Sequence, residues 1–220
     1  MPTHQFNANV RAVKTTAALL AILLLSHCAQ TPGPAPTEPV NSLAHEQRLR
    51  TIKQWHLKAK AGLRSPEQNG SARLGWQQNP DDFYISLSGP LGQGRVALNG
   101  DPDGVTLTQP DAEPLRAASA EALLYQQTGW ELPVSLLTDW LLGLPAQTLP
   151  IDNLTRDHNG LLKTLNQAGW QLSYSGYQAV NDVFLPGKII ATRELDDKQS
   201  MRLVIAVYDW QTTQANATHQ

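Results

Sequence analysis

The chain has 220 residues, of which 41% are hydrophobic and 16% charged, and its formal net charge is −2. A chain of this length and composition fits one globular domain with a sizeable core. The basic residues are dispersed and outnumbered by acidic ones, which argues against nucleic acid as a partner.

Residues 1–27 have the pattern of an export signal. They contain no acidic residue, carry Arg11 and Lys14, and then run "TAALLAILLLSH". A basic segment before a short apolar run is typical of a secretory signal peptide, and the run is shorter than the roughly 20 residues of a membrane-spanning helix. We predict that residues 1–27 are removed, with a retained anchor helix as the alternative. The remainder has 15 basic and 19 acidic residues, a formal net charge of −4.

Cys28, the only cysteine, follows the apolar run directly. A lone cysteine in an exported protein cannot form an internal disulfide, so another modification is expected. "LLLSHC" resembles the bacterial lipoprotein signal, in which the cysteine thiol receives diacylglycerol, although His27 departs from the small residue usual there. In that family Ala29, in place of Asp, implies sorting to the outer membrane. The proline-rich residues 28–40 predict a semi-rigid tether, and residues 41–220 the folded domain.

The domain begins with a short helix predicted over 42–54 and continues as strands. Residues 55–63 alternate apolar and polar side chains, as expected of a half-buried antiparallel strand. Further strands are predicted over 71–78, 83–89, 95–100 and 105–110, separated by turn-forming residues. Together these five strands predict a meander that curls into a sheet or a barrel.

One turn of this meander has an unusual composition. The stretch "SLSGPLGQGRVAL", residues 86–98, places Leu91 between Pro90 and Gly92 at the predicted hairpin tip. Polar residues such as Asn, Asp and Ser are the usual choice there. An exposed leucine at a tip therefore calls for a functional explanation.

The middle of the chain predicts two helices, after which strands resume. Ser119 can cap the first helix, and Pro133 can begin the second, "VSLLTDWLLGL", which Gly143 ends. The second helix is apolar on nearly all sides and must be buried. Strands are then predicted within 170–178, 185–195 and 201–210.

Catalytic and metal-binding patterns are missing from the sequence. It has no G-x-S-x-G or H-E-x-x-H motif, and its acidic pairs fall in predicted turns. The histidines His45, His56, His158 and His219 stand singly in polar contexts, which predicts surface positions. We therefore expect no enzymatic activity, metal or cofactor. Six tryptophans, the meander and the apolar helix instead suit a pocket for lipid chains.

Four segments carry a family resemblance: "WQQNPDDFYISLSGPLGQGRVAL", "ELPVSLLTDWLLGLP", "WQLSYSGY" with "LPGKI", and "RLVIAVYDW". Together they resemble the LolB family of outer-membrane lipoproteins, over roughly residues 41–210. The resemblance implies a mainly β fold, an incomplete antiparallel barrel of about eleven strands with about three helices closing over a hydrophobic cavity. It implies that Leu91, with Pro90 and Gly92, forms a loop that promotes insertion into the membrane.

The resemblance also implies the function and the partners. Such a protein, anchored in the outer membrane and facing the periplasm, receives client lipoproteins from a LolA-like carrier and inserts them into the inner leaflet. We expect a monomer that contacts membrane lipid and the clients' acyl chains. Candidates to line the cavity are apolar residues of the early strands and the central helix: Leu57, Leu63, Phe83, Ile85, Leu87, Trp140 and Leu141. Each could instead be ordinary core, since a one-residue slip reverses the face of a strand.

Three alternatives remain at this point. A soluble LolA-like carrier would have a similar fold without the anchor. A structural or assembly lipoprotein of the outer membrane would need no cavity. A lipid hydrolase is the least favoured, since no nucleophile and base can be placed in the sequence.

Overall fold

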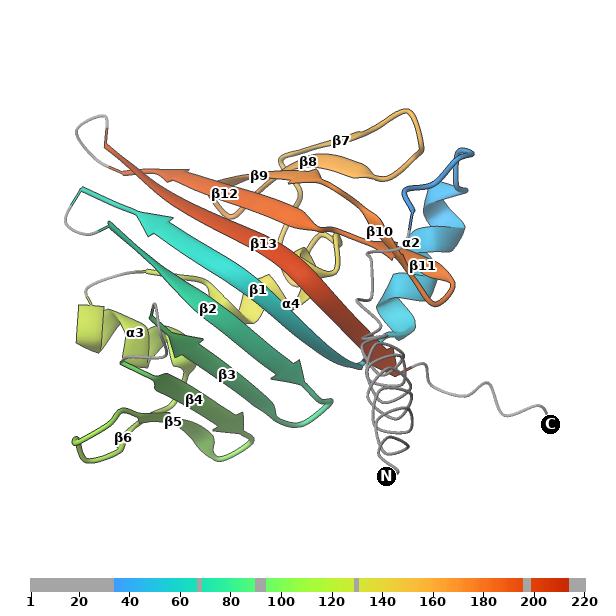
Figure 1. Ribbon diagram of the computed structural model, residues 1–220. Helices are drawn as coiled ribbons and strands as arrows, with labels where there is room; N and C mark the ends of the chain where they lie inside the picture. The colour runs from blue at the N-terminus through green and yellow to red at the C-terminus, as the bar shows by residue number, and fades with distance from the viewer. Residues whose placement is uncertain (1–33, 67–68, 90–93, 129–130, 196–198, 214–220) are drawn as a thin grey trace, which may run out of the picture. The chain divides into compact units, whose positions relative to one another are not determined.

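The fold is dominated by one antiparallel sheet of eleven strands (Figure 1). The computed structural model describes residues 34–66, 69–89, 94–128, 131–195 and 199–213, all within one structural unit. The strand order is β6-β5-β4-β3-β2-β1-β13-β12-β9-β8-β7, so the sheet is not closed into a barrel. Cys28 and the tip residues Pro90, Leu91 and Gly92 lie outside the described residues.

The strands of the main sheet are β1 (Gln54–Arg64), β2 (Asn69–Gln78), β3 (Phe83–Ser88), β4 (Val96–Asp101), β5 (Gly104–Thr108), β6 (Leu115–Ala117), β7 (Asn153–Arg156), β8 (Leu162–Gln167), β9 (Trp170–Ser175), β12 (Lys188–Glu194) and β13 (Ser200–Thr213). A separate hairpin consists of β10 (Gln178–Val180) and β11 (Val183–Leu185). The predicted mainly β architecture of about eleven strands is confirmed.

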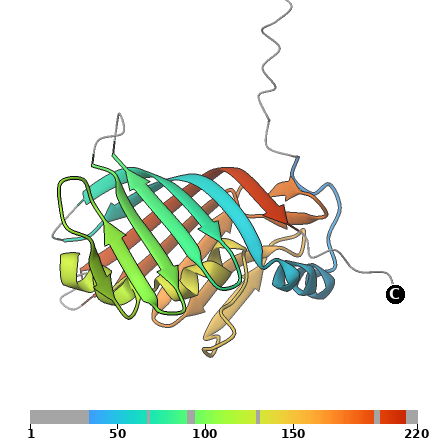
Figure 2. The same ribbon diagram turned by 90° about the horizontal axis from the view of Figure 1, so that it is seen from below.

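The alternation of side chains sets the two faces of the sheet. In β1, Trp55, Leu57 and Ala59 are buried whereas Lys58 and Lys60 are exposed. The sheet curves strongly, and helices lie against its concave side (Figure 2). The apolar series therefore faces the interior, and the polar series forms the convex outer face.

The hairpin turns divide between the two ends of the sheet. Because β1 to β4 are consecutive antiparallel strands, the last residues of β1 and β3 and the first residues of β2 and β4 lie at the same end. The pairing of Arg64 with Arg202 brings the end of β12 and the start of β13 to that end as well (Figure 1). We call it the tip end of the sheet.

Three helices occur among the described residues: α2 (Ser42–Thr51), α3 (Ala120–Thr128) and α4 (Val134–Leu141). The Ser119 hydroxyl accepts a hydrogen bond from the Ala122 N–H (3.1 Å), which confirms the predicted cap of α3. Helix α4 follows Pro133, as predicted, and stops before Gly143. Gly143 has a φ of +77°, and a Cβ there would lie 3.2 Å from the Pro186 Cγ, so glycine suits this turn in both respects.

The predicted N-terminal helix is confirmed but shorter than expected, and the surface position predicted for His45 was wrong. Helix α2 ends at Thr51, because Ile52 is already extended and leads into β1. His45 is buried, with 4% of its surface exposed, and its Nε2 accepts a hydrogen bond from the Phe184 N–H (3.1 Å). Burial, with the nearby charge of Arg48, lowers the pKa of His45. This histidine fixes α2 to the β10–β11 hairpin and is not a surface residue.

Candidate functional site

The concave face of the sheet is a continuous apolar surface, on which α3 and α4 pack. Helix α3 lies beside β5 and β6 and buries Leu123, while α4 buries Trp140, whose ring is 6.5 Å from that of Trp170 on β9. Side chains from both halves of the sheet and both helices form one core. Helix α4 thus lies over the middle of the concave face, and α3 lies at its β5–β6 edge (Figure 2).

The structure places all seven predicted lining residues on the interior side. Leu57 and Ile85 flank Trp76 in one row across β1, β2 and β3. Four members are buried and three are half-buried; the buried ones are Leu57, Ile85, Trp140 and Leu141, and the others are Leu63, Phe83 and Leu87. The buried members could contact a guest molecule only after the helices move.

The three half-buried members lie at two different ends of the sheet. Phe83 begins β3, and its ring covers Gly100, where an added Cβ would overlap the ring. Leu63 and Leu87 lie at the tip end, where Leu63 pairs with Leu203 and Leu87 with Val96. All four of these residues are half-buried and pack against the core. We call Leu63, Leu87, Val96 and Leu203 the apolar rim.

Sequence reasoning missed a tryptophan cluster at the opposite end of the concave face. The Trp55 ring lies 5.6 Å from that of Trp76 and 5.6 Å from that of Trp210. The Trp210 Nε1 donates a hydrogen bond to the Pro186 carbonyl (3.0 Å). The period-two pattern of β1 indicated that Trp55 faces inward. In β13 the same period would place Asp209 inward, and only the register shift opposite Lys58 and Ala59 turns Trp210 to the interior, so the sequence could not show that the rings meet. This cluster closes the end away from the rim.

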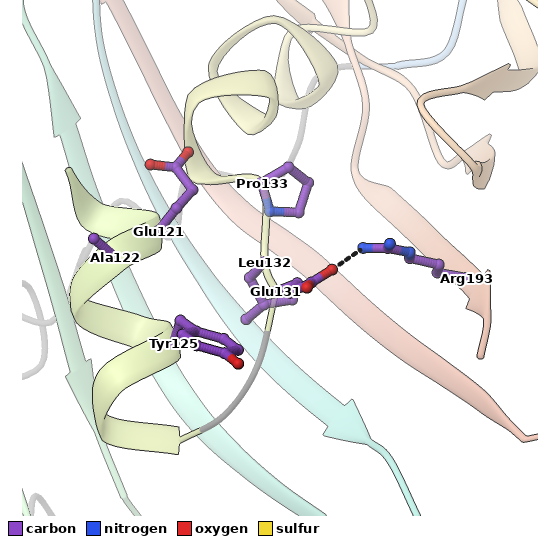
Figure 3. A pocket seen from close by; sticks show the side chains of 7 residues that line it. All are labelled: Glu121, Ala122, Tyr125, Glu131, Leu132, Pro133 and Arg193. Carbon is purple, nitrogen blue, oxygen red and sulfur yellow. Dashed lines mark ion pairs between the residues drawn. The ribbon is translucent and has the colours of Figure 1, made fainter. Parts of the chain in front are cut away.

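A pocket of about 410 Å³ lies between α3, residues 131–133 and β12 (Figure 3). We call residues 131–133, which precede α4, the joining segment. The pocket's lining residues are Glu121, Ala122, Tyr125, Glu131, Leu132, Pro133 and Arg193. Arg193 comes from the interior face of β12 near the tip end, opposite Met201 of β13. The volume of the pocket lies within the roughly 300–1,000 Å³ of pockets for drug-sized ligands.

One polar contact holds the joining segment to β12, and a second holds α3 to α4. Arg193 Nη1 lies 3.0 Å from Glu131 Oε2, and both side chains are substantially exposed. An exposed ion pair contributes only about 0–1 kcal/mol, so it restrains the segment weakly. Glu121 Oε1 accepts a hydrogen bond from the Ser135 N–H (2.7 Å), which ties α3 to the first turn of α4.

The stability of this helix contact should depend on pH. Burial alone would raise the pKa of Glu121, but the hydrogen bonds it accepts, led by that from the Ser135 N–H, outweigh burial and hold the pKa below its ordinary value of 4.5. The folded protein therefore binds fewer protons here than the unfolded chain, so the stabilisation is complete above about pH 4.5 and disappears as the pH falls through the lowered pKa. We expect Glu121→Gln to lower the free energy of unfolding by about 1 kcal/mol at neutral pH.

Urea unfolding of both proteins between neutral and acidic pH measures this difference. It should shrink as the pH falls, because the wild-type carboxylate becomes protonated. A difference that stays constant over this range would contradict the assignment to Glu121.

The described residues show no other reactive centre. No group of three or more His, Cys, Asp or Glu side chains in this part of the chain could hold a metal ion. None of the helices that the structure describes is long and apolar enough to span a bilayer. The prominent features of the site are thus its apolar rim and the weakly held segment beside it.

Comparison with known proteins identifies the family. The model of the family described as "Outer membrane lipoprotein LolB" matches residues 53–210. The chain belongs to the LolB family. It is 42% identical over 198 residues to the outer-membrane lipoprotein LolB of Cellvibrio japonicus, covering 88% of this chain and 94% of that protein. The LolB of Nitrosococcus oceani is 38% identical over 195 residues, with the same coverage.

Among solved structures, a LolA superfamily protein from Nitrosomonas europaea matches with a TM-score of 0.48 and 9% identity, covering 79% of this chain and 94% of that one. The family match includes every strand of the main sheet except the last residues of β13. The apolar rim and the segment beside it thus lie within the part of the chain that the LolB family shares.

Proposed function

We propose that this LolB family protein is anchored in the outer membrane through lipid on Cys28, faces the periplasm, and accepts lipoproteins from a LolA-like carrier for insertion into the inner leaflet. The relatives at 42% and 38% identity are named outer-membrane lipoproteins, which supports this location. The lone cysteine after the apolar run supplies the attachment point. One acyl chain binds a membrane only marginally, so a stable anchor requires two or more chains.

The free-energy cost of exposing acyl chains to water explains why a carrier protein is needed. A client with about 45 acyl methylenes, at ~0.8 kcal/mol each, would face on the order of 35 kcal/mol in water. An apolar surface that covers the chains removes most of this cost. No nucleotide is needed if the affinity for the chains rises from the carrier to this protein and then to the bilayer.

The observation that carries the proposal is the apolar rim at the tip end. Its four residues, Leu63, Leu87, Val96 and Leu203, are apolar and only half-buried, and they continue inward into the core beneath α3 and α4. The adjoining segment is held to β12 by the exposed Glu131–Arg193 pair. Acyl chains would first contact the rim and then enter by displacing this segment from the concave face.

Photo-crosslinking from the rim tests the proposal. A photoreactive phenylalanine analogue at Leu87 should crosslink to the labelled acyl chains of a client, because Leu87 faces the interior. The same analogue at Ser88, the next residue of β3, faces the convex side and should give little product. The two variants differ by one position in a single strand, so differences in folding or client supply affect them similarly.

Equal crosslinking at both positions would contradict the acyl-binding role of the concave face. A folded Leu87 variant that accepts clients without crosslinking to their chains would contradict it too. A protein that binds neither clients nor a fluorescent apolar probe would favour the structural lipoprotein instead.

Metabolic labelling with palmitate, in the wild type and in Cys28→Ala, separates the anchored protein from a soluble LolA-like carrier.

A further inference from the structure

The convex face carries like charges directly opposite each other near the tip end. Arg64 of β1 pairs in register with Arg202 of β13, and Lys60 of β1 pairs with Arg73 of β2. Cross-strand partners share a face, and like charges in such pairs destabilise a sheet. None of these four side chains forms an ion pair with another residue that the structure describes. These four basic residues are separated in the sequence, but strand pairing brings them together on the convex face.

A pocket of about 250 Å³ lies between the two arginines. It is lined by Gly62, Leu63, Arg64, Asn69, Gly70, Ser71, Arg202 and Val204. The nearest atom to a Cβ built at Gly62 is the Gly70 carbonyl oxygen, 3.9 Å away, so the pocket is open there because residue 62 has no side chain. Two guanidinium groups, a hydroxyl and an amide around a small hollow are suited to a phosphate group.

The location of this pocket favours a phosphate at a membrane surface. It lies at the tip end, where β3 ends and β4 begins (Figure 1). Leu91 lies between these two strands in the sequence. The lining of the pocket contains no aromatic side chain, whereas the central contacts of protein–protein interfaces are commonly Trp or Tyr. Basic residues near an anionic leaflet are attracted to its surface.

We propose that the pocket between Arg64 and Arg202 binds the phosphate of an anionic phospholipid, and that Lys60 and Arg73 extend this basic surface. The tip end would then be held against the leaflet while the loop containing Leu91 enters it. The inference rests on the proposed function, because that function is what directs the tip end toward the membrane. It adds a lipid-headgroup site on the convex face, separate from the acyl-binding surface on the concave face.

Hydrogen exchange of the full-length acylated protein tests this site. The protein is reconstituted in vesicles of phosphatidylcholine with phosphatidylglycerol, or of phosphatidylcholine alone. We expect exchange in residues 60–66, 69–73 and 199–206 to be several-fold slower with phosphatidylglycerol. This protection should be lost in the double variant Arg64→Gln/Arg202→Gln, and also in Gly62→Val, which fills the pocket with a side chain that suits a strand.

Lys58→Gln is the matched control. Lys58 lies on the same strand and face, but its Nζ is 2.9 Å from the Asp209 carboxylate, so its charge is already compensated. This variant loses one positive charge from the same face, against two in the double arginine variant, and should keep the protection. The double arginine variant should also have a raised melting temperature, because a repulsive pair is removed, and a lowered one would indicate a structural role instead.

Three results would overturn the proposal. The first is equal exchange in both kinds of vesicle. The second is protection by glycerol phosphate added to phosphatidylcholine vesicles that matches the effect of phosphatidylglycerol, since the site would then take a soluble phosphate. The third is protection that requires a carrier protein and not phosphatidylglycerol. Crosslinking at Leu87 tests acyl binding separately, so failure of either idea can be recognised on its own.

Discussion

Replacing Gln167 with alanine is expected to lower the free energy of unfolding by about 4 kcal/mol. Gln167 is fully buried on β8, and its Oε1 accepts hydrogen bonds from the Trp140 Nε1 and the Ala146 N–H, both 2.9 Å. Its Nε2 donates to the carbonyls of Ala146 (2.8 Å) and Leu149 (3.0 Å). One side chain thus ties α4 and the chain after it to the sheet, and its loss leaves buried polar groups without partners.

Urea or thermal unfolding measures this loss. Gln171→Ala on neighbouring β9 removes the same amide from an exposed position and should change stability by less than about 0.5 kcal/mol. Equal stability of the two variants would show that water replaces the buried amide without cost. Because α4 covers the concave face, Gln167→Ala should also increase binding of a fluorescent apolar probe under conditions in which the protein remains folded.

The strands with clear alternation could be predicted from the sequence, and the shorter ones could not. Residues 55–63 and 201–210 became β1 and most of β13, because one face of each is apolar along its length. Strands β7 and β8 were missed. β7 is the four-residue segment "NLTR", in which only Leu154 is apolar, and β8 reads "LKTLNQ" without a regular period. These two strands form because they pair with each other, with Leu154 opposite Leu165. The local pattern of either segment does not reveal this pairing.

The sequence allowed us to predict which apolar residues face the interior, but not how deeply each is buried. The apolar set was found from the period of each strand, whereas Trp140 and Leu141 are completely buried because α3, β8 and β9 surround α4. The pattern Ile189, Ala191, Arg193 indicates that Arg193 faces inward, against the expectation for a charged residue. Its partner Glu131 lies on a distant segment, so only the fold reveals the contact. The basic convex surface likewise depends on the register between strands.

Leu91→Glu is expected to slow delivery of clients to membranes about ten- to hundredfold, while folding and acceptance of clients remain unchanged. One leucine that enters lipid gains about 1.5–3 kcal/mol, and a glutamate at the same place loses this gain and opposes entry. The measurement is the transfer rate of a labelled lipoprotein from this protein to liposomes, with acceptance from the carrier followed separately.

Leu91→Ile is the control, because it keeps an apolar side chain of the same size and should deliver at the normal rate. A normal rate for Leu91→Glu would show that the tip does not insert. If Leu91→Glu and Arg64→Gln/Arg202→Gln both deliver slowly but accept clients normally, Leu91 and the arginine pair both act in the delivery step. The two contributions should then add, since one acts through the apolar layer of the leaflet and the other through its headgroups. If instead the arginine variant alone were slow, headgroup attraction and not leucine insertion would determine how this LolB family protein reaches the bilayer.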